Sequence, residues 1–224
     1  MLDEPLGLTV HSLPAPQDAL TDDARRTGRG RLKMLAVLAV CAAPVVASYF
    51  TYYVLRPEGR RNYGELIEPQ RPLPALSATS LDGKPLSLSS LKGQWLLVSV
   101  AGGACDQACQ GHLYLQRQLR ESLGKEKDRL DWVWLVTDQA PVPASLLPAV
   151  RQATVLRVDA TQLGRWLEPA AGLRLPEHLY LVDPLGNWML RFPAGLGSAE
   201  ALKAKRDLDR LLRASASWDL PGRP

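Results

Sequence analysis

Cys105 and Cys109 are the residues of this sequence best suited to chemistry. They stand where an apolar run typical of a buried strand, residues 95–101, gives way to a helical pattern. Unpaired backbone N–H groups and the helix dipole at such a junction favour a thiolate, the form of cysteine that attacks disulfides and binds soft metals. Because residues four apart share one face of a helix, the pair predicts a shared soft metal ion, or a disulfide if the first turn is distorted.

A structural disulfide, or two buried thiols, is the alternative interpretation of this pair. A disulfide that constrains the unfolded chain gains most by closing a long loop, and here only three residues intervene. The remaining cysteine, Cys41, lies in an apolar segment and is expected to behave as a small hydrophobic residue. We therefore expect Cys105 and Cys109 to carry the chemistry of the chain.

The apolar periodicity predicts an α/β domain around this pair. The expected strands lie at residues 86–88, 95–101, 131–137, 154–158, 179–182 and 188–192. The expected helices lie at residues 106–123, 144–153, 160–167 and 199–214. Strands that first alternate with helices and then pair as a hairpin predict a mixed central sheet with helices on both faces. This is the order of elements in a thioredoxin-like domain.

Three polar side chains accompany the cysteines. Asp106 is expected to cap the helix that begins at the pair. His112 follows Cys109 by about one helical turn, so it is either a metal-binding imidazole or a half-buried residue of the helix's apolar stripe. His178 precedes the strand at 179–182, in a loop that faces the cysteines in a thioredoxin-like sheet. Two thiolates and an imidazole suit copper, especially Cu(I), although a surface-loop histidine is the alternative for His178.

Residues 34–55 predict a transmembrane helix. The segment carries no charge, and at 1.5 Å per residue a helix of this length spans a hydrocarbon core of about 30 Å. Basic residues are more frequent before it than after it, which favours a cytoplasmic N-terminus and a periplasmic C-terminal domain. A cleaved signal peptide is the competing interpretation, but its apolar core would be shorter.

The expected organisation follows from this segment. Residues 1–33 are predicted to be a loop-like cytoplasmic tail and residues 56–75 a polar, proline-containing linker. The thioredoxin-like domain is expected at 76–216, with a C-terminal tail at 217–224. The localisation implied is a bacterial inner membrane, crossed once.

Composition and motifs exclude several classes of function. The formal charge of +4 is small and the basic residues are scattered, which argues against nucleic-acid binding. Three cysteines are too few for a miniprotein stapled by disulfides. The sequence contains no glycine-rich phosphate loop, no HExxH zinc motif and no GxSxG nucleophile elbow.

The exported part of the chain resembles the Sco/SenC family of thioredoxin-like cytochrome c oxidase assembly proteins. The matching segments are the CxxxC pair and residues 81–83, 91–93 and 180–186. The resemblance implies that Cys105, Cys109 and His178 hold copper for the copper centre of the oxidase. It also implies an oxidase subunit or another assembly factor as the partner. The sequence departs from the family at Gln110, where a proline is usual, and at residues 137–140, where the family's DPxRD motif is missing. His178 also stands closer to the following strand than the family's histidine does.

A second comparison is with membrane-anchored thiol–disulfide reductases. Thioredoxins place a cis-proline before the equivalent strand, and Pro176 stands in that position. Three functions therefore remain open: a copper-binding assembly factor, a thiol–disulfide oxidoreductase in which Cys105 attacks and Cys109 resolves, and a non-catalytic assembly scaffold.

Overall fold

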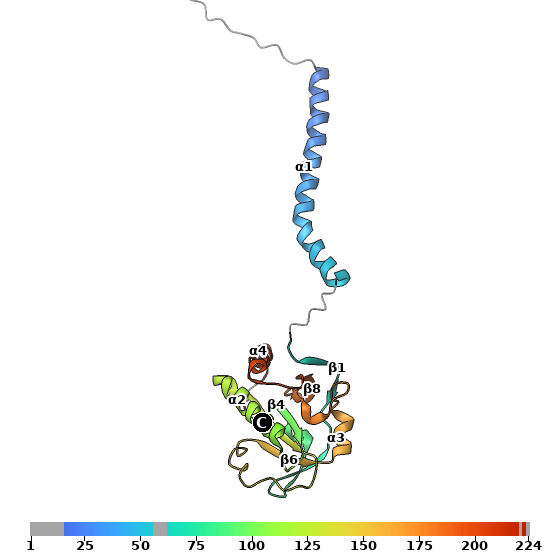
Figure 1. The fold of residues 1–224 in the computed structure, drawn as a ribbon. Helices are drawn as coiled ribbons and strands as arrows, with labels where there is room; N and C mark the ends of the chain where they lie inside the picture. The colour runs from blue at the N-terminus through green and yellow to red at the C-terminus, as the bar shows by residue number, and fades with distance from the viewer. Residues whose placement is uncertain (1–15, 56–61, 220, 223–224) are drawn as a thin grey trace, which may run out of the picture. The chain divides into compact units, whose positions relative to one another are not determined.

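The computed structural model describes residues 16–55, 62–219 and 221–222, which belong to two compact units, Met1–Arg60 and Arg61–Pro224. The described part of the first unit is the helix α1 (Pro16–Phe50) and the π-helical turn η1 (Thr51–Leu55) (Figure 1). Residues Gly30–Val54 are long and apolar enough to cross a membrane, as are both membrane anchors and signal sequences. Residues 16–33 are helical, so the prediction of a loop-like tail is wrong there, and residues 1–15 lie outside the described residues.

The second unit is built on one eight-stranded mixed sheet, which confirms the predicted fold class. The strand order is β1-β8-β7-β4-β5-β6-β2-β3. β4, β5 and β6 are parallel, whereas β7, β8, β1, β2 and β3 pair with antiparallel neighbours. The strands are β1 (Glu65–Pro72), β2 (Ser77–Ser80), β3 (Pro85–Ser87), β4 (Trp95–Ala101), β5 (Leu130–Val136), β6 (Thr154–Val158), β7 (Leu179–Val182) and β8 (Asn187–Arg191).

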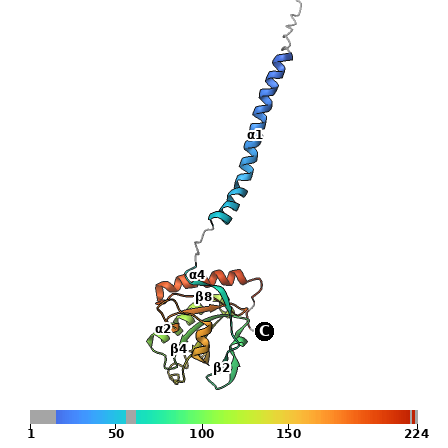
Figure 2. The same ribbon diagram turned by 90° about the vertical axis from the view of Figure 1, so that its right-hand side faces the viewer.

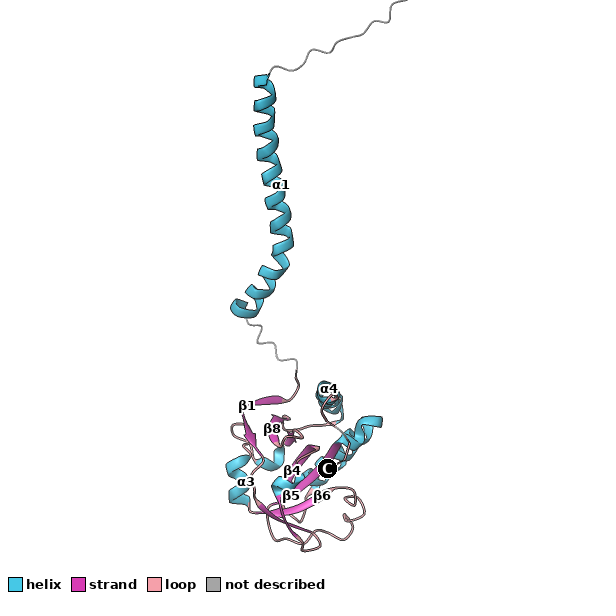
Figure 3. Cartoon of the chain, turned by 180° about the vertical axis from the view of Figure 1, so that it is seen from behind, coloured by secondary structure: helices cyan, strands magenta, loops and turns pink. Residues whose placement is uncertain are grey.

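Helices cover both faces of this sheet (Figures 1 and 2). The longer helices α2 (Gln107–Ser122) and α4 (Ser198–Ser215) contact each other and pack on one face, and α3 (Ala160–Trp166) packs on the other. Short 3₁₀ turns complete the chain at η2 (Leu88–Leu91), η3 (Gly124–Arg129) and η4 (Leu175–Glu177). In the view of Figure 3, the central strands β4 and β8 lie between α3 and α4.

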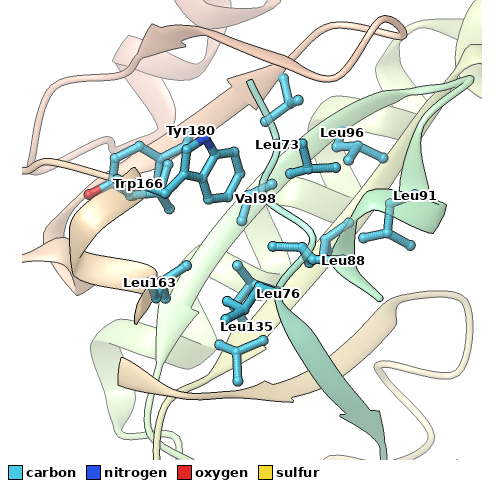
Figure 4. Packing of buried hydrophobic residues seen from close by; sticks show 14 of the residues in the cluster. Leu73, Leu76, Leu88, Leu91, Leu96, Val98, Leu135, Leu163, Trp166 and Tyr180 are labelled. Atoms are coloured by element: carbon cyan, nitrogen blue, oxygen red, sulfur yellow. The ribbon is translucent and has the colours of Figure 1, made fainter. Parts of the chain in front are cut away.

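The central strand β4 is buried on both faces, because its side chains alternate between the two helical layers. Leu97 belongs to an apolar cluster that includes residues of α2 and α4. Leu96 and Val98 belong to the cluster on the other face, which includes Leu163 and Trp166 of α3 (Figure 4). This burial explains the uninterrupted apolar run of the sequence. Because β4 is held in the core, the loop that carries Cys105 starts from a firmly packed strand end.

Two expectations about segments are corrected. The predicted linker, residues 56–75, contains the strand β1, which pairs with β8 at the edge of the sheet. Residues 144–153, predicted as a helix, form consecutive turns instead. Pro148 lacks the backbone N–H that a helix would use as a hydrogen-bond donor. Val150, in the same irregular segment, is buried.

The predicted C-terminal tail begins inside the domain. Asp219 is buried, and its Oδ2 lies 2.7 Å from the Arg129 guanidinium and 2.8 Å from Trp95 Nε1. Ser215 Oγ lies 2.9 Å from the same guanidinium. Residues as far as Asp219 therefore belong to the packed domain.

Candidate redox site

Cys105 and Cys109 form a disulfide at the N-terminus of α2, with their Cα atoms 5.1 Å apart. Cys105 lies just outside the helix, since Asp106 is the N-cap residue. The Asp106 carboxylate accepts a hydrogen bond of 2.9 Å from the backbone N–H of Cys109, which confirms its predicted capping role. The helix therefore starts after the first cysteine, and the chain folds back to bring the two sulfurs together.

The backbone of Cys105 is strained. Its φ of 45° is the only positive value among the described residues other than glycine. Its N–H donates to the carbonyl of Gly102, 3.2 Å away, and its own carbonyl accepts from Gln110 Nε2 at 3.0 Å. Such conformations persist only when the surroundings hold them, and they cluster at functional sites.

The disulfide lines a cleft of about 700 Å³. Small residues of the cysteine loop and of α2, including Ala104, Ala108 and Gly111, form one wall. η4 and the loop after β8 supply the facing residues. Both cysteines are largely buried, so the cleft is the route by which another molecule reaches the sulfurs.

His112 shares this cleft with the cysteines. Burial lowers the pKa of its imidazole, and the Pro176 backbone and the Asp106 carboxylate partly oppose this. The ring is therefore neutral at neutral pH. Of the two histidines considered from the sequence, His112 is the one that lies on the cleft.

His178 is a buried residue of the core instead. It is 1% exposed, so the alternative of a surface-loop histidine is wrong. Its Nε2 accepts a hydrogen bond from the backbone N–H of Ala170 at 3.2 Å, and its Nδ1 donates to the carbonyl of Phe192 at 2.9 Å. With both ring nitrogens engaged, the copper ligand set of Cys105, Cys109 and His178 does not fit this conformation. A copper-binding role for His178 stays a prediction.

We expect His178→Ala to destabilise the domain by about 2–4 kcal/mol, because it removes the hydrogen-bond partner of the buried Phe192 carbonyl and of the partly buried Ala170 N–H. Urea unfolding of the full chain in detergent measures this, with His112→Ala, at a half-buried site, expected to lose less than about 1 kcal/mol. A variant as stable as the parent would contradict the structural role. Loss of Cu(I) binding without loss of stability would instead favour the ligand role.

The cis-proline expectation is wrong. Among the described residues the only cis peptide bond is Glu68–Pro69, at the edge strand β1. Pro176 lies within η4, where it forms part of the cleft wall.

The profile of one protein family, described as the transmembrane-like, thioredoxin-like, C-terminal domain, matches residues 95–215. The chain belongs to this transmembrane-like, thioredoxin-like family. The match runs from the start of β4 to the end of α4 and includes both cysteines. A companion profile, the transmembrane-like N-terminal domain, matches residues 24–54, which overlap the apolar part of α1.

Several solved structures are similar to this transmembrane-like, thioredoxin-like chain at low identity. A SCO1/SenC family lipoprotein from Bacillus anthracis is 19% identical, with a TM-score of 0.49, over 65% of this chain and 98% of its own. ScoI from Bradyrhizobium japonicum, solved with copper bound, is 16% identical, with a TM-score of 0.43, over 59% and 96%. A thiol:disulfide interchange protein from Bacteroides sp. is 18% identical, with a TM-score of 0.46, over 62% and 88%. No curated protein matches the chain.

Proposed function

We propose that the protein is a thiol–disulfide exchange protein whose Cys105–Cys109 pair cycles between dithiol and disulfide. The observation that carries the proposal is the disulfide itself. It closes a loop of only three intervening residues, which contributes little to stability, and it lies on a cleft with a strained backbone at Cys105. A disulfide in this position is better suited to thiol–disulfide exchange than to stabilising the fold.

The exchange reaction follows from the positions of the two cysteines. In the reduced protein, the Cys105 thiolate, next to the N-terminus of α2, attacks a disulfide of the partner. A mixed disulfide forms and the first partner sulfur leaves as a thiolate. Cys109, having lost its proton, then attacks the Sγ of Cys105 and releases the second partner thiolate. The partner disulfide is reduced to two thiols, and the Cys105–Cys109 disulfide is formed.

The proposed partners are cysteine-bearing proteins of the respiratory membrane: a cytochrome c oxidase subunit with its copper-ligand cysteines, or another assembly factor. The apolar helix within α1 supports this choice, because an anchored domain has a high effective concentration near membrane partners. The proposed location is the bacterial inner membrane, with the domain in the periplasm. In this compartment thiol pairs are readily oxidised.

The test is the stoichiometric reduction of a model disulfide by the full chain, reduced beforehand and held in detergent. We expect the reduced protein to reduce a synthetic peptide containing one disulfide, releasing two thiols per protein oxidised, and Cys105→Ser to lose this reaction. A parallel Cu(I) titration of the reduced protein addresses the copper-binding alternative. Tight stoichiometric copper binding without disulfide reduction would reject the proposal in favour of copper handling, and absence of both would favour a scaffold.

A further inference from the structure

The loop that leads to Cys105 is held by a carboxylate from a different strand. Asp138 follows β5, and its Oδ1 accepts hydrogen bonds from the backbone N–H groups of Gly103 at 2.7 Å and Ala140 at 3.1 Å. Gly103 is two residues before Cys105. One side chain therefore joins the loop after β4 to the loop after β5.

The two loops approach so closely that only glycine fits between them. A Cβ atom added at Gly103 would collide with the carbonyl oxygen of Ala140, and one at Gly102 would collide with the Asp138 carboxylate. The carbonyl of Gly102 in turn accepts a hydrogen bond from the backbone N–H of Cys105. Two hydrogen bonds, one from the Gly103 N–H to the Asp138 carboxylate and one from the Cys105 N–H to the Gly102 carbonyl, thus connect Asp138 with the strained cysteine.

Arg157 of β6 holds the second loop. Its guanidinium donates to the carbonyl of Asp138 at 2.7 Å and to the carbonyl of Ala140 at 2.8 Å. These bonds fix the backbone on both sides of Gln139, so that the Asp138 carboxylate remains directed at the cysteine loop. In the sequence, residues 137–140 stand out only because the DPxRD motif of the Sco/SenC family is missing there.

We infer that Asp138 is a positioning residue for the Cys105–Cys109 pair and that Arg157 keeps it in place. The inference rests on the proposed function, because positioning has consequences only if the pair cycles. By holding the loop, Asp138 keeps Cys105 in the conformation that closes the disulfide. Closure in its absence must order a freer loop, so the disulfide forms less favourably.

The test is the equilibrium between the pair and the glutathione couple, measured on the full chain in detergent by alkylating free thiols. We expect Asp138→Ala to lower the equilibrium constant for disulfide formation about tenfold, equivalent to about 30 mV for this two-electron couple. Asp138→Asn is the matched control, because its amide oxygen still accepts both N–H groups, and it should stay within about twofold of the parent. An unchanged constant in a folded Asp138→Ala variant, or an equal fall in both variants, would overturn the inference.

Arg157→Met keeps the test decisive if Asp138→Ala does not fold. This variant loses both guanidinium hydrogen bonds and keeps the carboxylate, so we expect a smaller fall in the same direction, about threefold. If the equilibrium constant for disulfide formation does not change in Arg157→Met, Arg157 does not hold Asp138 in place. If Asp138→Ala is also unfolded, this unchanged constant overturns the whole inference. A parent protein whose pair does not equilibrate with glutathione at all would reject the proposed function instead.

Discussion

Cys109→Ser is expected to accumulate as a mixed disulfide between Cys105 and the partner, whereas Cys105→Ser forms no such adduct. Without Cys109, no second thiol is available to attack the mixed disulfide, so the reaction stops at its midpoint and turnover is lost. The adduct is detected in membranes quenched with acid and separated without reductant, and its partner peptide is identified by mass.

The third cysteine provides the control for this experiment. Cys41 is a free cysteine in α1, exposed within the first unit. Cys41→Ser should therefore leave both the adduct of the Cys109→Ser protein and the turnover of the parent unchanged. Adducts of equal abundance from Cys105→Ser, or none from Cys109→Ser, would contradict the assignment of Cys105 as the attacking residue.

Asp219→Ala is expected to lower the free energy of unfolding by about 3–5 kcal/mol, because it leaves the buried Arg129 guanidinium without its most buried partner. Burial opposes the charge of Arg129, but hydrogen bonds to Glu126 and Asp219 outweigh it and raise the pKa of the guanidinium. The variant also removes the nearer acceptor of Trp95 Nε1, at 2.8 Å, and leaves only Ser215 Oγ, at 3.2 Å. Denaturant unfolding followed by circular dichroism measures the loss.

Asp209→Ala is the matched control for this prediction. Asp209 also forms an ion pair, with Lys205 of the same helix α4 at 2.6 Å, but both side chains are partly exposed. We expect its removal to change stability by about 0.5 kcal/mol or less. A similar small loss in Asp219→Ala would show that the C-terminal segment is not part of the cooperative domain.

The central strands of the fold were predictable from the sequence, whereas β1 and β2, at or next to the two edges of the sheet, were not. β4 and β5 lie between other strands, so burial imposes largely apolar runs that indicate a strand directly. β1 is an edge strand with polar and proline residues, and its sequence has the composition of a linker. Its identity as a strand depends on pairing with β8, more than a hundred residues away in sequence.

The candidate site also has one part that was predictable from the sequence and one part that was not. The pair Cys105 and Cys109 was recognised from residue type and the strand–helix junction, both of which are local. The environment of His178 was not, because its partners at Ala170 and Phe192 are brought together only by the packed sheet. The role of Asp138 could not be predicted from the sequence for the same reason, since a single aspartate in a loop has no local sequence pattern that indicates its contacts.

The reduction potential of the Cys105–Cys109 pair tests most directly whether its disulfide is a reactive bond. The full chain in detergent is equilibrated with thiol–disulfide buffers of graded potential, and the oxidised fraction is read by alkylation and mass. We expect reversible two-electron behaviour with a midpoint between about −120 and −270 mV, the range of thiol–disulfide oxidoreductases. A pair that remains fully oxidised below about −300 mV, as structural disulfides do, would contradict the claim.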